Sequence, residues 1–205
     1  MKNVAIIDYG MGNLRSVENA IKRLNYNSKI VDSPKDLDNF EKIILPGVGS
    51  FKKAMKLLEE KNWINYIKSN VLEKKKHLFG ICLGMQLLAT QSEEFGLSNG
   101  LNLIDGKIKF LGNLGCKYKI PQIGWNSISI KKKHEFLNGI PNMMDFYFVN
   151  SYVFVPKDTS CEVATSKYDV SFSSVISKEN IFGTQFHPEK SSNAGIKILE
   201  NFLKS

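Results

Sequence analysis

The chain has 205 residues, of which 42% are hydrophobic and 23% charged, and its formal net charge at pH 7 is +8. This composition is close to the average of globular proteins, which excludes a disordered, collagen-like or disulfide-stapled chain. Roughly 70% of the unfolded surface can be buried at this length, so we expect one self-sufficient domain over residues 1–205.

The termini and the cysteines exclude several further classes. No apolar run reaches the roughly 18 residues of a membrane span. Asp8 directly follows the first apolar run, and no signal-peptide cleavage site is present. The three cysteines are odd in number and lack CxxC spacing, which argues against a disulfide framework or a zinc site. We therefore expect a cytoplasmic protein that has no membrane contact and needs neither a metal ion nor a cofactor.

The basic charge comes almost entirely from lysine. Of the 28 lysine and arginine residues only Arg15 and Arg23 are arginine, the residue that most often reads guanine and phosphate. The lysine runs at 74–76 and 131–133 are interpreted as solvated faces. The sequence therefore predicts no nucleic-acid partner.

The first half of the chain alternates between apolar strands and helices. Helical spacing and turn signals predict helices over 13–24, 51–60 and 83–91. Strands are predicted in front of and between them, at 4–8, 28–31, 42–45 and 78–82. Unbroken apolar strands, each leading through a glycine turn into a helix, are typical of a parallel sheet covered on both faces.

From about residue 106 the pattern changes to alternating segments. These predict mostly antiparallel strands and hairpins that extend the sheet or form a flap, at 107–111, 123–130, 146–155 and 170–176. A last strand is predicted at 181–186 and a closing amphipathic helix at 194–203. The sequence therefore predicts an α/β fold with a mostly parallel central sheet and an antiparallel extension in the second half.

Turns at the carboxyl ends of the parallel strands predict where the site lies, because ligands of open α/β sheets bind there. Among these turns, Gly80-Ile81-Cys82-Leu83-Gly84 has the form of a nucleophile elbow. Its glycines allow a sharp strand-to-helix turn, and a helix N-terminus favours the thiolate, which is the attacking form. Cys82 is therefore the candidate nucleophile, whereas Cys116 and Cys161 are interpreted as buried structural cysteines.

A cysteine nucleophile needs a base and a group that orients the base. His187 ends an apolar strand and is followed, one proline later, by Glu189, whereas His77 and His134 follow lysine runs and are interpreted as surface residues. Cys82, His187 and Glu189 form the candidate triad.

An oxyanion hole is expected to complete this chemistry. One donor is the backbone N–H of Leu83, directly after the nucleophile. The other is expected from the glycine-flanked Val48 in the 46–49 turn.

These motifs together resemble those of the class I (triad) glutamine amidotransferases. In this chain they are G-I-C-L-G-M-Q at 80–86 and Q-F-H-P-E at 185–189. Within that family, the resemblance is to the glutaminase subunits of imidazole glycerol phosphate synthases and spans the whole chain. It rests on residues 8–17, 46–51, 124–126 and 187–192. The resemblance implies a flavodoxin-like, three-layer fold.

The resemblance also implies roles for individual residues. Cys82 would attack the side-chain amide of L-glutamine, His187 would protonate the departing ammonia, and Glu189 would orient His187. Val48 would donate its backbone N–H to the oxyanion after a peptide flip. The glutamine pocket would fall on Gly47, Gly49, Gln86, Ser151 and Tyr152, and the side facing the partner, where ammonia leaves, on Asn13, Tyr147 and Lys190.

A partner protein is expected on two grounds. Glutaminase motifs extend from residue 8 to residue 189, which leaves no room for a domain that consumes ammonia, and ammonia released into water becomes protonated and loses its nucleophilicity. The resemblance implies a heterodimer with a (βα)8-barrel cyclase of histidine biosynthesis, and low activity for the isolated subunit.

Two positions depart from the family pattern: Gln122 and Asn150 stand where histidine is usual. Relatives of this subunit also supply ammonia for amidation of a sugar in surface-polysaccharide or flagellin-glycan synthesis, which is the alternative function. Two other hypotheses are a stand-alone cysteine enzyme with the same type of sheet and a noncatalytic binding module.

Overall fold

The structure is a computed structural model that describes residues 4–205, so residues 1–3 of the expected domain lie outside it. Its centre is an eight-stranded sheet in the order β2-β1-β3-β4-β14-β13-β12-β9. Five neighbouring strands are parallel: β2 (Ser28–Val31), β1 (Val4–Ile7), β3 (Lys42–Gly47), β4 (His77–Cys82) and β14 (Ile181–Thr184). The other three continue the sheet with antiparallel pairing: β13 (Val170–Lys178), β12 (Glu162–Tyr168) and β9 (Ser129–Ile130).

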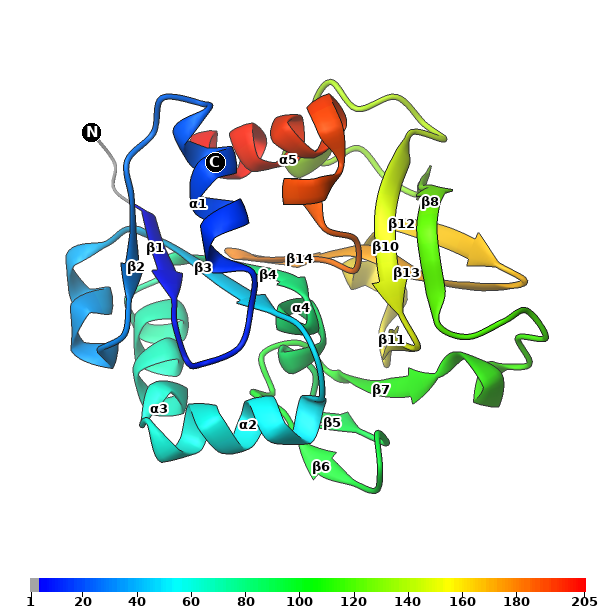
Figure 1. Cartoon of the computed structure of the whole chain (residues 1–205), viewed down its shortest axis with the longest axis horizontal. Coiled ribbons are helices and arrows are strands. Elements are labelled where there is room, and N and C mark those ends of the chain that lie inside the picture. Colours follow the sequence, from blue (N-terminus) through cyan, green and yellow to red (C-terminus); the bar gives the residue numbers. More distant parts are fainter. Residues whose placement is uncertain (1–3) are drawn as a thin grey trace.

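Helices cover both faces of this sheet, which gives three layers (Figure 1). On one face lie α1 (Leu14–Lys22) and α5 (Ser192–Lys204). On the other lie α2 (Phe51–Glu60), α3 (Trp63–Lys68) and α4 (Leu83–Leu87). Alternate residues of the central strands supply the two cores, as Val4 and Ile6 face one and Ala5 and Ile7 the other. The predicted α/β fold is confirmed.

Two smaller sheets lie beside the central one. A four-stranded sheet has the order β11 (Tyr152–Pro156), β7 (Gly106–Phe110), β5 (Gln91–Ser92) and β6 (Ser98–Asn99). A two-stranded ribbon pairs β10 (Asp145–Asn150) with β8 (Gln122–Ser127). Short turns of 3₁₀ or π helix connect these elements, at Pro34–Asn39, Ser69–Glu73, Leu111–Leu114, Glu135–Leu137, Thr159–Cys161 and Pro188–Lys190.

The segment predicted at 146–155 forms two strands, because the chain changes sheets at Ser151. The residues before Ser151 pair with β8 and those after it pair with β7. The Ser151 carbonyl accepts the N–H of Leu111 at 2.9 Å, which holds the crossing point in place. Similarly, the predicted strand at 123–130 is divided between β8 and β9.

The predicted helix at 83–91 is wrong in length, since α4 ends at Leu87. The backbone carbonyls at its end accept N–H groups from a distant segment: Leu87 from Leu101, and Leu88 from Leu103 and Ile104. These long-range bonds provide donors for the carbonyl groups at the C-terminus of α4. A further helical turn is therefore not needed to satisfy them.

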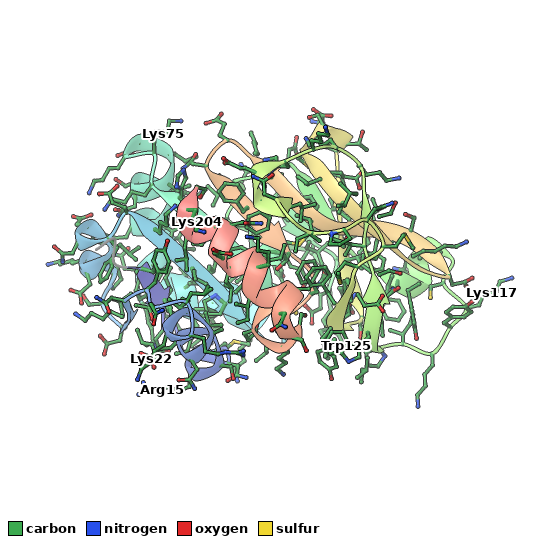
Figure 2. The ribbon with its side chains drawn as sticks, turned by 90° about the horizontal axis from the view of Figure 1, so that it is seen from above. Arg15, Lys22, Lys75, Lys117, Trp125 and Lys204 are labelled. Atoms are coloured by element: carbon green, nitrogen blue, oxygen red, sulfur yellow. The ribbon has the colours of Figure 1, made fainter. Side chains whose placement is uncertain are left out.

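Exposed charge is spread over the molecule. Figure 2 shows Arg15, Lys75 and Lys117 at three different edges of the view. Several surface lysines have acidic neighbours, such as Lys75 with Glu179 at 3.2 Å. The absence of a nucleic-acid partner stays a prediction.

Within residues 4–205 no helix is both long and apolar enough to span a bilayer. Over the same residues, histidine, cysteine, aspartate and glutamate side chains nowhere gather in groups of three or more that could hold a metal ion.

Candidate active site

Cys82 sits on a strained turn between β4 and α4. Its backbone has φ 54° and ψ −109°, a conformation that a residue other than glycine rarely adopts. The turn is possible because its glycines pack directly on backbone: a Cβ on Gly84 would lie 1.8 Å from the Leu45 carbonyl oxygen, and one on Gly80 would lie 2.6 Å from the Gly84 carbonyl oxygen. The local geometry is that of a nucleophile elbow, with the sulfur presented at the end of the strand.

His187 and Glu189 form a buried pair in the turn that follows β14. The Nδ1 atom of His187 lies 2.9 Å from Oε1 of Glu189, and the side chains are only 4% and 2% exposed. The turn is anchored, since the His187 N–H donates to the Tyr147 carbonyl and the Ser191 hydroxyl donates to the His187 carbonyl. The carboxylate therefore fixes the imidazole and leaves its Nε2 atom for chemistry.

One cavity of about 420 Å³ brings most of the candidate residues together, a size typical of small-molecule sites. Cys82 and His187 both line it, and β4, β14 and the strand-changing segment at Ser151 converge there. The candidate residues in its lining are Val48, Gly49, Cys82, Leu83, Gln86, Ser151, Tyr152, His187 and Lys190.

The remaining candidate residues lie next to this cavity or further away. Gly47 is the register partner of Cys82 in the neighbouring strand, and Glu189 lies behind His187. Tyr147 stands beside Lys190, whose Nζ is 5.9 Å from the centre of the Tyr147 ring. Asn13 is outside the cavity lining, at the N-cap of α1.

The electrostatics of the site favour a charged imidazole. Burial by itself lowers the pKa of His187, but the Cys82 thiolate and the Glu189 carboxylate outweigh burial and raise that pKa to about 10. A protonated imidazole held between a thiolate and a carboxylate can give its proton to a leaving group. The arrangement is therefore suited to nucleophilic attack by sulfur with acid catalysis.

Two buried polar side chains in this region were not among the residues that the sequence predicted for the site. Glu94, 7% exposed, lines the cavity, and its Oε2 accepts the N–H of Phe51 at 2.8 Å. Burial raises the pKa of this carboxyl group. Gln185 is fully buried, and its Nε2 lies 3.8 Å from the sulfur of Cys82. The pair of acidic residues Glu93 and Glu94, directly after the short strand β5, was the only sequence signal for Glu94.

The two departures from the family pattern face each other. Gln122 and Asn150 are register partners across β8 and β10, and both are buried. Asn150 also lines the cavity, and its Nδ2 donates to the Tyr152 carbonyl at 3.3 Å. The two positions are thus adjacent across the ribbon beside the site.

The chain belongs to the class-I glutamine amidotransferase family, whose family model matches residues 5–205. Within this family it groups with the HisH subunits of imidazole glycerol phosphate synthase, as the following relatives show.

The HisH subunit of Caldanaerobacter subterraneus subsp. tengcongensis is 47% identical over 201 residues, which cover 97% of this chain and 96% of that protein. The subunit named HisH 1 of Campylobacter jejuni strain RM1221 is 46% identical over 202 residues, covering 98% of this chain and 99% of the relative. The predicted family resemblance is confirmed.

Solved structures support the fold. PurLQS from Thermotoga maritima superposes with a TM-score of 0.78 at 19% identity, covering 100% of this chain and 99% of that one. A structure titled glutamine amidotransferase superposes with a TM-score of 0.77 at 20% identity, covering 98% of this chain and 97% of that one. At such identities the likeness bears on the fold alone.

Proposed function

We propose that this chain is the glutaminase subunit of imidazole glycerol phosphate synthase, which hydrolyses L-glutamine to glutamate and passes the ammonia to a cyclase partner. The observation that carries the proposal is the strained Cys82 in one cavity with the buried His187–Glu189 pair. The full-length similarity to HisH subunits supports it independently.

The proposed mechanism uses Cys82, His187 and Glu189 as the triad. The thiol proton moves to Nε2 of His187, and the sulfur attacks the side-chain carbonyl carbon of glutamine. Backbone N–H groups of Leu83 and, after a peptide flip, of Val48 stabilise the oxyanion. The C–N bond then breaks, His187 gives its proton to the nitrogen, and ammonia leaves a thioester on Cys82.

Hydrolysis of the thioester follows from the same electrostatics. Once the sulfur is acylated, its negative charge no longer supports the protonated imidazole, and burial favours the neutral ring. Neutral His187 can take a proton from water as the water attacks the thioester. Glutamate leaves and the thiol is restored.

Glutamine fits the charges and hydrogen-bonding groups of the cavity. One oxygen of Glu94 accepts the Phe51 N–H, which leaves the other for the α-ammonium group of the substrate. We assign the remainder of the pocket to Gly47, Gly49, Gln86, Ser151 and Tyr152. A buried carboxylate in the cavity can pair with the α-ammonium group of an amino acid, which an uncharged amide lacks. The cavity therefore favours an amino-acid substrate.

A partner surface next to the cavity supports transfer of ammonia within a complex. The outer face of the β8–β10 ribbon exposes 64% of Ile123 and 55% of Trp125, and the Trp125 ring lies edge-on to Tyr147 at 6.1 Å. Figure 2 shows Trp125 at the periphery of the molecule. Exposed aromatic residues of this kind favour protein–protein contacts. We propose that a (βα)8-barrel cyclase docks here in the cytoplasm.

Ammonia would pass to that partner beside Asn13, Tyr147 and Lys190. Tyr147 joins the two sites, because its carbonyl accepts the His187 N–H while its ring contacts Trp125.

The test is release of glutamate by the purified chain with and without its cyclase. We expect slow turnover alone, faster turnover in the complex, and no turnover with Cys82→Ala. Cys116→Ala is the matched control, since Cys116 is also a buried free cysteine, but its sulfur donates to the Tyr168 carbonyl. Equal glutamate release by Cys82→Ala and the unmodified chain would end the proposal.

The other hypotheses have less support. The relatives named above are synthase subunits, so sugar amidation is not favoured. A stand-alone cysteine enzyme of another class would be active without a partner and would not be modified by a glutamine-analogue affinity label. A noncatalytic module would release no glutamate.

A further inference from the structure

A short chain of buried amides connects the cavity to the sulfur of Cys82. Gln185 Nε2 lies 3.8 Å from Cys82 Sγ, and Gln185 Oε1 accepts a hydrogen bond from Nε2 of Gln86 at 3.0 Å. Nε2 of Gln86 also donates to the carbonyl of Tyr152 at 2.9 Å. Gln185 is fully buried and Gln86 is 6% exposed, so water does not compete for these bonds.

The Tyr152 carbonyl fixes the orientation of both amides. A carbonyl oxygen only accepts, so the Gln86 atom that faces it must be the NH2 group. That NH2 group also faces Gln185, which must therefore present its oxygen to Gln86 and its own NH2 group to the sulfur. A flipped Gln185 would place oxygen against sulfur and two NH2 groups against each other.

This orientation favours the ionised form of Cys82. In the thiol form, the S–H of Cys82 donates to the Val149 carbonyl at 3.8 Å. That bond is lost when the proton moves to His187, whereas the N–H of Gln185 remains directed at the sulfur. A thiolate accepts a hydrogen bond far better than a thiol does, particularly away from water.

We propose that Gln185 is a further catalytic residue whose side-chain N–H stabilises the Cys82 thiolate, and that Gln86 acts through it as a positioning residue. The inference rests on the proposed function in that it takes Cys82 as the nucleophile. It adds a donor to the reacting sulfur that is separate from the triad and from the oxyanion hole.

Other charged and titratable groups lie around the sulfur, and a substitution at Gln185 replaces none of them. The imidazolium of His187 faces it from the turn after β14, with Glu189 behind. Tyr9, two residues after the end of β1, interacts electrostatically with Cys82. Glu94 and Lys190 line the same cavity. A comparison of variants at Gln185 alone therefore isolates the amide.

The test is the pH dependence of Cys82 alkylation by iodoacetamide in the full chain, followed by mass spectrometry of the peptide that carries Cys82. Gln185→Met keeps the length of the side chain and removes its N–H. We expect the midpoint of alkylation to move up by about 1–2 pH units, as for loss of a hydrogen bond to a charged group. Gln185→Glu adds a negative charge and should raise the alkylation midpoint further.

The matched control is Gln122→Met, which removes a buried amide that has no hydrogen bond to the sulfur. Its alkylation midpoint should equal that of the unmodified chain. Gln86→Met should shift the midpoint in the same direction as Gln185→Met but by less, since Gln185 then keeps its N–H without a fixed orientation.

Turnover in the complex with the cyclase gives a second readout. Gln185→Met should lower kcat about tenfold or more at neutral pH with little change in KM, and raising the pH should restore much of the rate. A purely structural role would not be rescued by pH. A midpoint for folded Gln185→Met or Gln185→Glu within about 0.3 pH units of the unmodified chain would overturn the proposal.

The proposed glutaminase function would survive that result as long as Cys82→Ala abolishes glutamate release. Conversely, an active Cys82→Ala chain would remove the proposed function, whatever the alkylation experiments show.

Discussion

Glu94 offers a specific test of the substrate, because its carboxylate has two separable roles. Its Oε2 accepts the N–H of Phe51 at the start of α2, and the carboxylate also lines the cavity. Glu94→Gln keeps an oxygen for the Phe51 N–H and removes the charge. Glu94→Ala removes both the oxygen and the charge. A comparison of the two variants therefore separates binding of the substrate ammonium group from the stability of α2.

The expected magnitude follows from the burial of Glu94, which is 7% exposed. Loss of one partner of a buried charge pair costs about 2–3 kcal/mol, which is a factor of about 30–150 in affinity. We expect Glu94→Gln to raise KM for glutamine by this factor and to change kcat little. Glu94→Ala should also lower the midpoint of thermal unfolding.

The pH dependence gives an independent check. Burial raises the pKa of Glu94, so this carboxylate becomes neutral at a higher pH than an ordinary glutamate. As the pH falls through that raised pKa, KM should rise in the unmodified chain and stay flat in Glu94→Gln. The measurement is steady-state release of glutamate in the complex between pH 5 and 8. A KM within threefold of the unmodified chain, with the same pH profile, would refute the assignment.

Three other predictions concern the elbow and the triad. Gly84→Ala should destabilise the chain by about 3 kcal/mol in urea unfolding, because its Cβ would meet the Leu45 carbonyl oxygen; a loss below about 0.5 kcal/mol would contradict the packing. In Cys82→Ala the pKa of His187, measured by NMR of the ring, should fall from about 10 by at least about 2 units, since the thiolate is the strongest of the charges that raise it; a value that stays near 10 would contradict this. Glu189→Gln should lower kcat about tenfold or more at unchanged KM, and an unchanged kcat would exclude an orienting role.

Much of the fold could be predicted because it depends on local patterns. The buried parallel strands contain continuous apolar runs, such as Ile43 to Leu45 in β3, and the glycines of the elbow mark a turn that other residues cannot make. The end of α4 could not be predicted, because the backbone groups that satisfy it come from Leu101, Leu103 and Ile104 in another segment.

The same distinction applies to the site. Cys82 and His187 stand out in the sequence because each stands at the end of a predicted strand and carries a reactive side chain. Glu94 and Gln185 do not, because an isolated carboxylate or amide gains its role from what lies opposite it. The contact of Gln185 with the sulfur depends on the parallel pairing of β14 with β4, which joins residues about a hundred positions apart.

The central claim is that the sulfur of Cys82 attacks the side-chain carbonyl of glutamine. The most direct measurement is mass spectrometry of the intact chain and its peptides after incubation with an electrophilic glutamine analogue. We predict one label per chain, on the peptide that carries Cys82, with labelling slowed by glutamine. Labelling of Cys116 or Cys161 instead, or labelling that glutamine does not slow, would contradict the account.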